Sequence, residues 1–166
     1  MSGTGKSSVL RSLAARGFET VDTDDEGWCE RRAGEHGQPE LLWREDRVRA
    51  LLDTPRDTAL IVQGCVPNQG RFYPDFAQVV LLTAPLDVMR ARILERPDNP
   101  FGKSGAQWAQ IVADTAEVVP LLRPGATLEL ETSHLSVAEV TDRLAALVSS
   151  ERRVRQATQP SQGATP

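Results

Sequence analysis

The first eight residues constrain the fold and chemistry of this chain more than any other stretch. Gly3, Gly5, Lys6 and Ser7 match the second half of the phosphate-binding pattern G-x-x-x-x-G-K-S/T, and apolar residues at helical spacing follow at once. Glycines let backbone N–H groups close around a phosphate, the lysine adds positive charge, and the serine hydroxyl can bind Mg²⁺. We expect phosphate contacts from Ser2, Gly3, Thr4, Gly5, Lys6, Ser7 and Ser8.

The stretch before this loop matters equally. The first glycine of the pattern would stand one residue before Met1, and so would the hydrophobic strand that normally feeds such a loop. A strand in that position lies in the middle of a parallel sheet, so we expect its absence to leave a gap between two neighbouring strands. We therefore hypothesise that the functional start lies upstream and that a strand and a glycine precede Met1.

Composition narrows the class of protein. The 166 residues are 40% hydrophobic and 25% charged, which is typical of one soluble domain. A net charge of −4 disfavours general binding to nucleic acid or to anionic membranes. The two cysteines form no disulfide framework, and no apolar run approaches the roughly 20 residues of a membrane span. We expect a cytoplasmic protein, and the sequence leaves its oligomeric state open.

Helical and strand patterns alternate along the chain, which predicts a parallel α/β sheet. The patterns predict helices over 6–16, 39–53, 85–95, 104–122 and 136–148, and strands over 18–23, 59–62, 78–83 and 127–132. Residues 27–38 and 64–76 are polar or turn-rich and are predicted to be irregular. We expect one domain over residues 1–148 and a disordered tail over 149–166.

Acidic residues follow the first predicted strand. Asp22 and Asp24 stand where the carboxyl ends of parallel strands form a ligand-binding crevice. Asp22 can hold Mg²⁺ through water, and Asp24 can accept a hydrogen bond from a substrate hydroxyl and act as the base. The alternative is that these carboxylates only solvate the strand end or cap a turn.

The chain resembles the shikimate kinase and nucleoside monophosphate kinase group over most of residues 1–148. The resemblance lies in GTGKSS, Val21-Asp-Thr-Asp24, Trp43-Arg44, the strand ending in Gly64, and Ala84-Pro-Leu-Asp-Val with the arginines that follow. Shikimate kinases carry D-x-D in the place of Asp22 and Asp24, and F-R in the place of Trp43-Arg44. They carry G-G-G where this chain has Gly64-Cys65-Val66. The resemblance implies a phosphate-loop NTPase fold with three α/β/α layers, and an AAA-type ATP-binding domain is compatible with the same loop.

This resemblance assigns an acceptor pocket. Arg44 would clamp an anionic group of the substrate, although a solvated helix face with side-chain pairs is the alternative. Gly64, Asn68 and Arg71 would line the pocket with Asp24. Because Gly64-Cys65-Val66 stands where shikimate kinases carry G-G-G, the identity of the acceptor stays open.

The resemblance also places a mobile lid at about residues 96–105. Arg92, Arg96 and Lys103 would close over the phosphates, and Arg96 would join Lys6 and Asp24 as a catalytic residue. The alternative for Arg96 is a basic helix end that complements the helix dipole.

Together these features predict an ATP-dependent kinase of a small hydroxylated metabolite, with ATP and Mg²⁺ as cofactors and with Ser7 and Asp22 as metal ligands. A nucleoside or nucleoside monophosphate kinase is the enzymatic alternative. A non-catalytic ATP-binding module is the alternative from another class.

Overall fold

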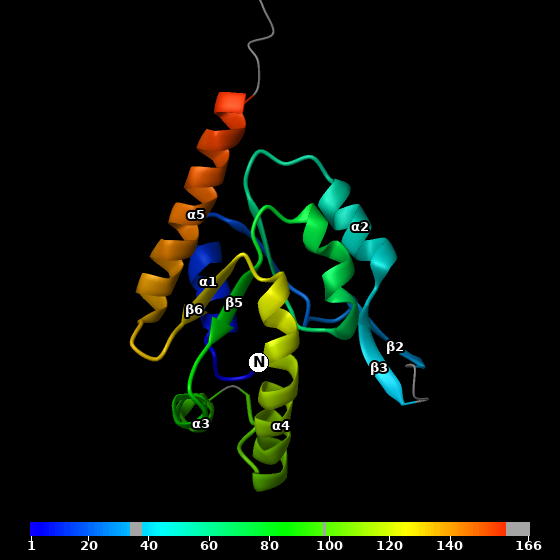
Figure 1. Ribbon diagram of the computed structural model, residues 1–166, viewed down its shortest axis with the longest axis vertical. Coiled ribbons are helices and arrows are strands. Elements are labelled where there is room, and N and C mark those ends of the chain that lie inside the picture. The colour runs from blue at the N-terminus through cyan, green and yellow to red at the C-terminus, as the bar shows by residue number, and fades with distance from the viewer. Residues whose placement is uncertain (34–37, 98, 159–166) are drawn as a thin grey trace, which may run out of the picture.

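The computed structural model describes residues 1–33, 38–97 and 99–158 (Figure 1). Helices and strands alternate through them much as predicted. The elements in chain order are α1 (Lys6–Ala15), β1 (Glu19–Asp22), β2 (Cys29–Ala33), β3 (Pro39–Trp43), α2 (Glu45–Asp53), β4 (Leu60–Gln63), η1 (Pro67–Asp75), β5 (Val80–Thr83), α3 (Leu86–Glu95), α4 (Gly105–Leu122), η2 (Arg123–Gly125), β6 (Leu128–Glu131) and α5 (Val137–Thr158), where η marks a 3₁₀ helix.

Four strands run in the same direction toward the phosphate loop. β1 pairs with β4 and β5 pairs with β6, both in parallel. The carboxyl ends of both pairs reach the loop, because Gln63 donates to Ser7 and Thr132, just after β6, donates to the carbonyl of Thr4. The predicted parallel α/β fold is therefore confirmed.

Apolar side chains from α1 and α5 cover one face of these strands. Val9 and Leu13 of α1 and Val140 of α5 are buried against Leu82 and Leu130 of the strands. A second core lies around Trp43, Val48, Val66 and Phe72, and a third around Met89, Ile93 and Ile111. The strands thus lie between helical layers, with the phosphate loop at their carboxyl ends.

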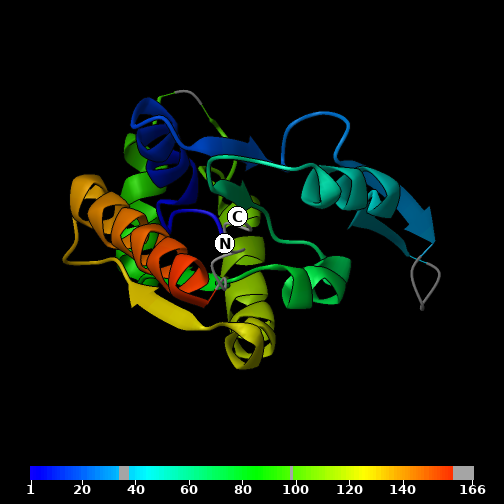
Figure 2. The ribbon, with the colours of Figure 1, turned by 90° about the horizontal axis from the view of Figure 1, so that it is seen from above.

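The two parallel pairs do not join into one sheet. Within the described residues, β4 pairs only with β1 and β5 pairs only with β6. Figure 2 shows β1 and β6 on opposite sides of the molecule with the N-terminus between them. A cavity of about 990 Å³, lined by β4 and β5, separates the pairs. The expected gap between neighbouring strands is present.

The stretch between β1 and α2 differs from its prediction. Residues 27–38 were expected to be irregular and 39–53 to be one helix, but β2 and β3 form an antiparallel hairpin and the helix begins only at Glu45. Pro39 suggested a helix start, yet proline is equally acceptable as the first residue of a strand. Along β3, Pro39 and Leu41 are exposed whereas Glu40 and Leu42 are half-buried, which is the alternation expected for a strand with one covered face, and Trp43 at its end is buried.

Two other predicted boundaries shift. The stretch 64–76, predicted to be a loop, contains the 3₁₀ helix η1. Ser136 and Glu139 form a capping box at the start of α5, and this helix continues to Thr158, past the predicted start of the tail at 149. Residues 34–37 of the predicted irregular stretch and 159–166 of the predicted tail lie outside the described residues.

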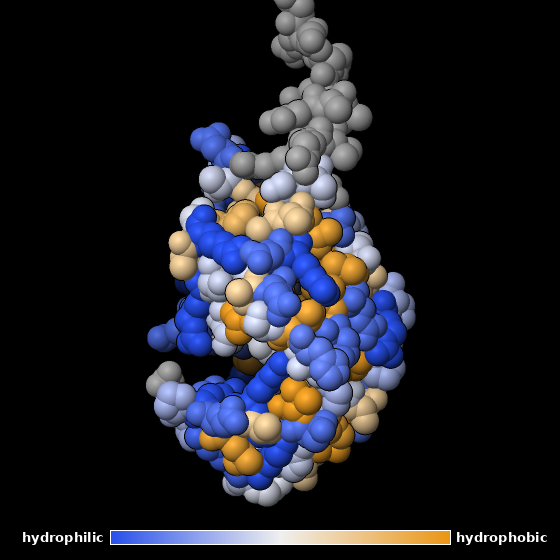
Figure 3. All heavy atoms as spheres, turned by 90° about the vertical axis from the view of Figure 1, so that its left-hand side faces the viewer, coloured by the Kyte–Doolittle hydropathy of each residue, from blue (hydrophilic) through white to orange (hydrophobic). Residues whose placement is uncertain are grey.

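The surface is mixed in character. On the face in Figure 3, hydrophilic residues separate the hydrophobic ones. Among residues 1–33, 38–97 and 99–158, no helix is both long and apolar enough to span a bilayer.

Candidate active site

The two glycines give the phosphate loop its shape. Gly3 and Gly5 have φ angles of 84° and 96°, in the left-handed region that favours glycine. A Cβ at Gly3 would also lie 2.8 Å from the carbonyl oxygen of Met89. Gly5 is the N-cap of α1, and no side chain caps the first turn of that helix. Its first backbone N–H groups can therefore receive an anion.

Lys6 and Thr4 fold back over the start of the chain. The Lys6 ammonium donates to the carbonyl of Met1 at 2.8 Å, and the Thr4 hydroxyl donates to the same oxygen at 3.0 Å. Thr4 is buried, whereas Ser2, Lys6 and Ser8 are half-buried and Ser7 is exposed. This hydrogen bond holds the Lys6 ammonium at the phosphate loop, beside the first turn of α1, which no side chain caps.

Two residues that are distant in sequence contact the backbone of the phosphate loop. Arg92 of α3 donates to the carbonyl of Gly3 at 3.4 Å, to the hydroxyl of Thr132 at 2.9 Å and to the carbonyl of Thr132 at 2.6 Å. The Thr132 hydroxyl contacts the carbonyl of Thr4 at 3.2 Å. Arg92, which was predicted as a lid residue, therefore contacts the phosphate loop and holds the position of its backbone.

A buried glutamine joins the predicted metal ligands. The Gln63 amide nitrogen donates to the Ser7 hydroxyl at 3.0 Å and to the Asp22 carboxylate at 2.8 Å. Gln63 is 7% exposed, and its carbonyl oxygen has no hydrogen-bond partner within the described residues. An oxygen in this state has free acceptor capacity beside a hydroxyl and a carboxylate.

These oxygen ligands fit Mg²⁺. Ser7 and Asp22 are hard oxygen donors, and Mg²⁺ is commonly bound by one or two carboxylates, retained waters and substrate phosphates. Within the described residues there is no cluster of three or more His, Cys, Asp or Glu side chains that could hold a metal by itself.

Asp22 and Asp24 belong to one turn. The other oxygen of Asp22 accepts the backbone N–H of Asp24 at 3.1 Å, so Asp22 also caps the turn, as the alternative interpretation proposed. Asp24 itself is exposed at the carboxyl end of β1.

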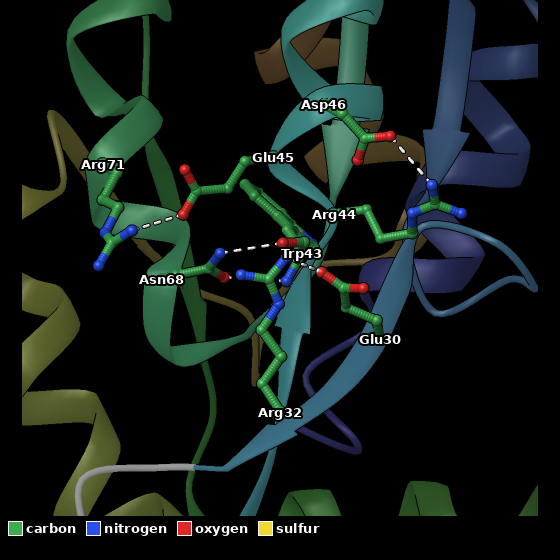
Figure 4. Close-up of polar contacts among 8 residues, drawn as sticks. All are labelled: Glu30, Arg32, Trp43, Arg44, Glu45, Asp46, Asn68 and Arg71. Atoms are coloured by element: carbon green, nitrogen blue, oxygen red, sulfur yellow. Dashed lines mark hydrogen bonds and ion pairs between the residues drawn. The ribbon is translucent and has the colours of Figure 1, made fainter.

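The predicted acceptor residues surround Trp43, but they do not converge (Figure 4). Arg44 pairs with Asp46 at 2.9 Å and Arg71 pairs with Glu45 at 2.5 Å, and the two arginines extend to opposite sides of Trp43. Both polar atoms of the Asn68 amide bond the backbone of Trp43, at 2.9 and 3.0 Å. In this arrangement Asn68 fixes the end of β3.

Close packing around residue 64 explains why a glycine stands there. A Cβ there would lie 2.1 Å from the Thr23 hydroxyl and 2.9 Å from the Trp43 ring. Thr23 in turn accepts the Trp43 indole N–H at 2.8 Å. Gly64 thus allows the hairpin to pack against the ends of β1 and β4.

Two of the three predicted lid cations, Arg96 and Lys103, bond their own segment. Arg96 donates to the carbonyls of Asn99 and Phe101, and Lys103 donates to the carbonyl of Arg96 at 2.7 Å. Partial burial lowers the pKa of Arg96 from its ordinary value. Residue 98 of this segment lies outside the described residues. Both cations therefore bind carbonyl groups of Arg96, Asn99 or Phe101.

Sequence reasoning missed Gln63 and Thr132. Gln63 ends the apolar run 59–62, and a polar residue at the carboxyl end of a parallel strand is a signal that identified Asp22 but was not applied here. Thr132 ends the predicted strand 127–132 and carries the same signal, although its contact with Thr4, 128 residues away in sequence, is not contained in the local pattern.

Two solved structures share this fold. The shikimate kinase of Acinetobacter baumannii, solved with shikimate, is 19% identical with a TM-score of 0.56, and covers 90% of this chain and 89% of its own. The shikimate kinase of Bacteroides thetaiotaomicron is 16% identical with a TM-score of 0.58, and the match covers 89% of this chain and 93% of that one. At these identities the likeness concerns the fold alone.

The sequence comparisons find one relative and one family model. A nucleotide-binding protein of Gluconacetobacter diazotrophicus is 28% identical over 142 residues, which are 84% of this chain but 38% of that protein. The chain thus spans less than half the length of this relative. The family model described as an AAA domain matches residues 1–113, from the phosphate loop to α4. With its loop, lysine and parallel strands in the arrangement described above, the chain belongs to the AAA-domain family.

Proposed function

We propose that this protein is an ATP-dependent, Mg²⁺-dependent kinase of a small hydroxylated metabolite. The observation that carries the proposal is the cluster of Ser7, Gln63 and Asp22 beside the uncapped first turn of α1. A phosphate-binding helix start and a set of oxygen ligands for Mg²⁺ are the two parts that phosphoryl transfer needs around the β- and γ-phosphates.

Each residue would have a distinct role. The backbone of the loop and Lys6 would bind the phosphates, while Ser7 and Asp22 would hold Mg²⁺, which neutralises developing charge on the phosphates. Asp24 would accept the proton of the acceptor hydroxyl as its oxygen bonds to the γ-phosphorus and ADP leaves. Arg96 would reach the transferring group after releasing its contacts to the segment around Phe101.

The acceptor would lie near Trp43, between Asp24 and the 3₁₀ helix η1. Arg71 and Glu45 form an exposed ion pair, with side chains 69% and 48% exposed. Exposed pairs contribute about 0–1 kcal/mol, so exchanging Glu45 for a substrate anion would cost little. The same argument applies to Arg44 and Asp46, so both arginines stay candidates for holding an anionic acceptor.

The test is ATP consumption against a panel of sugars, shikimate, nucleosides and nucleotides. We expect turnover with one class of hydroxylated acceptor, and we expect Lys6→Ala to abolish it with an unchanged melting temperature. Arg11→Ala, on an exposed position of the same helix, is the matched control and should keep full turnover. ATP binding without turnover on any acceptor would favour a non-catalytic module instead.

A second comparison separates the enzymatic alternatives. If the acceptor carries a phosphate, Arg71→Ala should weaken its binding much more than that of a neutral acceptor, because arginine binds two phosphate oxygens at once. Turnover on nucleoside monophosphates with this behaviour would replace our first proposal with a nucleotide kinase.

A further inference from the structure

A buried threonine lies between the two aspartates of the candidate active site. Thr23 follows Asp22, the predicted metal ligand, and precedes Asp24, the predicted base. It is 1% exposed, whereas Asp24 is exposed. The hydroxyl group of a threonine buried this completely needs hydrogen-bond partners within the protein.

The Thr23 hydroxyl has two partners from different parts of the fold. It donates to the backbone carbonyl of Gln63, at the end of β4, and the distance is 2.8 Å. It also accepts the indole N–H of Trp43, at the end of β3, and this distance is 2.8 Å as well. One hydroxyl group therefore joins the parallel strands to the β2–β3 hairpin. Both bonds are buried, so removal of the oxygen would leave an unpaired indole N–H in the interior.

The backbone of Thr23 makes the same connection. Its N–H donates to the Gln63 carbonyl at 2.9 Å, and its own carbonyl accepts the thiol of Cys29, from β2, at 3.3 Å. A Cβ at Gly64 would lie 2.1 Å from the Thr23 hydroxyl, so the glycine leaves room for this group. The ends of β1 and β4 and the hairpin thus meet at one residue.

Trp43 extends this connection to the predicted acceptor residues. Its backbone N–H and C=O both bond the Asn68 amide, and its ring packs against Phe72 at a centroid distance of 5.6 Å. Arg44, the next residue, is the N-cap of α2. Because these contacts fix Trp43, the bond between its indole and Thr23 sets where Arg44 stands relative to the end of β1.

We propose that Thr23 is a positioning residue, whose hydroxyl holds Asp24 and Arg44 at a fixed separation so that one acceptor molecule can contact both. This inference rests on the proposed function, in which those two residues are the base and a candidate anion-binding residue. Thr23 itself would touch neither ATP nor the acceptor. A misplacement of about 1 Å between reacting groups can lower a rate about 100-fold, so the loss of this hydroxyl should be visible in turnover.

The test compares three variants of the full chain. Thr23→Val keeps the shape of the side chain but can neither donate nor accept a hydrogen bond, whereas Thr23→Ser keeps the hydroxyl. Thr141→Val is the matched control. Thr141 is also fully buried, but its hydroxyl donates to the carbonyl of Val137 within α5, at 2.6 Å.

Hydrogen exchange is the first readout and needs no substrate. Thr23→Val should speed exchange of the Trp43 indole N–H and of the Arg44 amide by at least about tenfold, because the hairpin is no longer bonded to the strand ends through this hydroxyl. Thr23→Ser and Thr141→Val should keep both exchange rates close to those of the wild type.

Steady-state kinetics are the second readout, with ATP and the acceptor that the panel of metabolites identifies. Thr23→Val should lower kcat about 100-fold. The KM for ATP should stay unchanged, because neither partner of the hydroxyl belongs to residues 2–8. Thr23→Ser should restore most of the rate, and Thr141→Val should keep the wild-type rate.

Other outcomes would overturn the proposal. Unchanged exchange in Thr23→Val would show that the hydroxyl does not couple the hairpin to the strands. Faster exchange with an unchanged kcat would make Thr23 a purely structural residue, and an equal loss of kcat in Thr23→Ser would assign the effect to the methyl group. A wild type that phosphorylates no acceptor would refute the proposed function by itself, and the exchange rates would still decide whether Thr23 fixes Arg44.

Discussion

Replacing Gln63 by glutamate tests whether Ser7, Asp22 and residue 63 form one metal-binding unit. In Gln63→Glu a carboxylate replaces the amide whose nitrogen lies 2.8 Å from the Asp22 carboxylate. Two like charges about 4 Å apart repel by about 4 kcal/mol at an effective dielectric constant of about 20. Asp22 is half-buried, so solvent screens part of this repulsion. We therefore expect the free energy of unfolding to fall by about 2–3 kcal/mol at neutral pH.

The loss should depend on pH in a defined direction. Repulsion raises the pKa of the carboxyl pair in the folded variant above the roughly 4.3 of an unfolded glutamate. The folded variant therefore holds a proton more tightly than the unfolded chain. Relative to the wild type, its stability is best below about pH 4 and falls as the pH rises through the folded pKa.

Urea denaturation near pH 4.5 and pH 7.5, with and without Mg²⁺, measures these effects. Mg²⁺ should restore much of the lost stability at the higher pH, because the cation offsets two adjacent carboxylates. Gln63→Met is the matched control: it removes the amide donor and the unpaired buried oxygen but adds no charge and leaves Ser7 and Asp22 in place, so its response to pH and Mg²⁺ should be close to that of the wild type. The reasoning would be refuted if Gln63→Glu were destabilised equally at both pH values. It would also be refuted if Gln63→Met showed the same dependence on pH and Mg²⁺ as Gln63→Glu.

Three further perturbations test other parts of the structure. Asn68→Ala should reduce the free energy of unfolding by about 2–3 kcal/mol in urea titrations, since two buried hydrogen bonds to Trp43 are lost; a loss under about 0.5 kcal/mol would contradict this role. Gly3→Ala should cost at least about 2 kcal/mol by the same measurement, because of its positive φ and the contact with Met89, and wild-type stability would show that the loop adapts. For the chain with a free Met1 amino group, stability should rise between pH 5 and pH 8, by up to about 4 kcal/mol, because the folded amine, with its pKa lowered to about 5, binds fewer protons than the unfolded one. Acetylating that amine should abolish the slope, and a slope that survives acetylation would assign it to other groups.

The elements with strong periodicity were predictable from sequence. The helix after the phosphate loop and the apolar strands around Ile61 and Leu81 carry patterns of spacing that few other structures satisfy. Asp22 was placed correctly because the carboxyl end of a parallel strand is a defined position relative to the loop.

The hairpin of β2 and β3 was not predictable in the same way. Cys29–Ala33 is largely polar, and its pairing with Pro39–Trp43 is decided by contacts with distant residues, among them Asn68 and Thr23. A proline followed by leucines is compatible with both a helix start and an edge strand, so local preference alone cannot decide. The side-chain partners of Arg44, Arg71 and Arg92 likewise depend on tertiary contacts. The pattern of charges along the sequence does not predict such contacts.

The support of the phosphate loop has a consequence for the order in which the chain folds. The family model ends at residue 113, but Thr132, which contacts Thr4 and Arg92, lies beyond it, as does α5, which packs on α1. During synthesis at roughly 5–20 residues per second, Thr4 waits roughly 6–26 seconds for Thr132, 128 residues further on, to be made. The phosphate loop therefore leaves the ribosome well before the residues that support its backbone have been made.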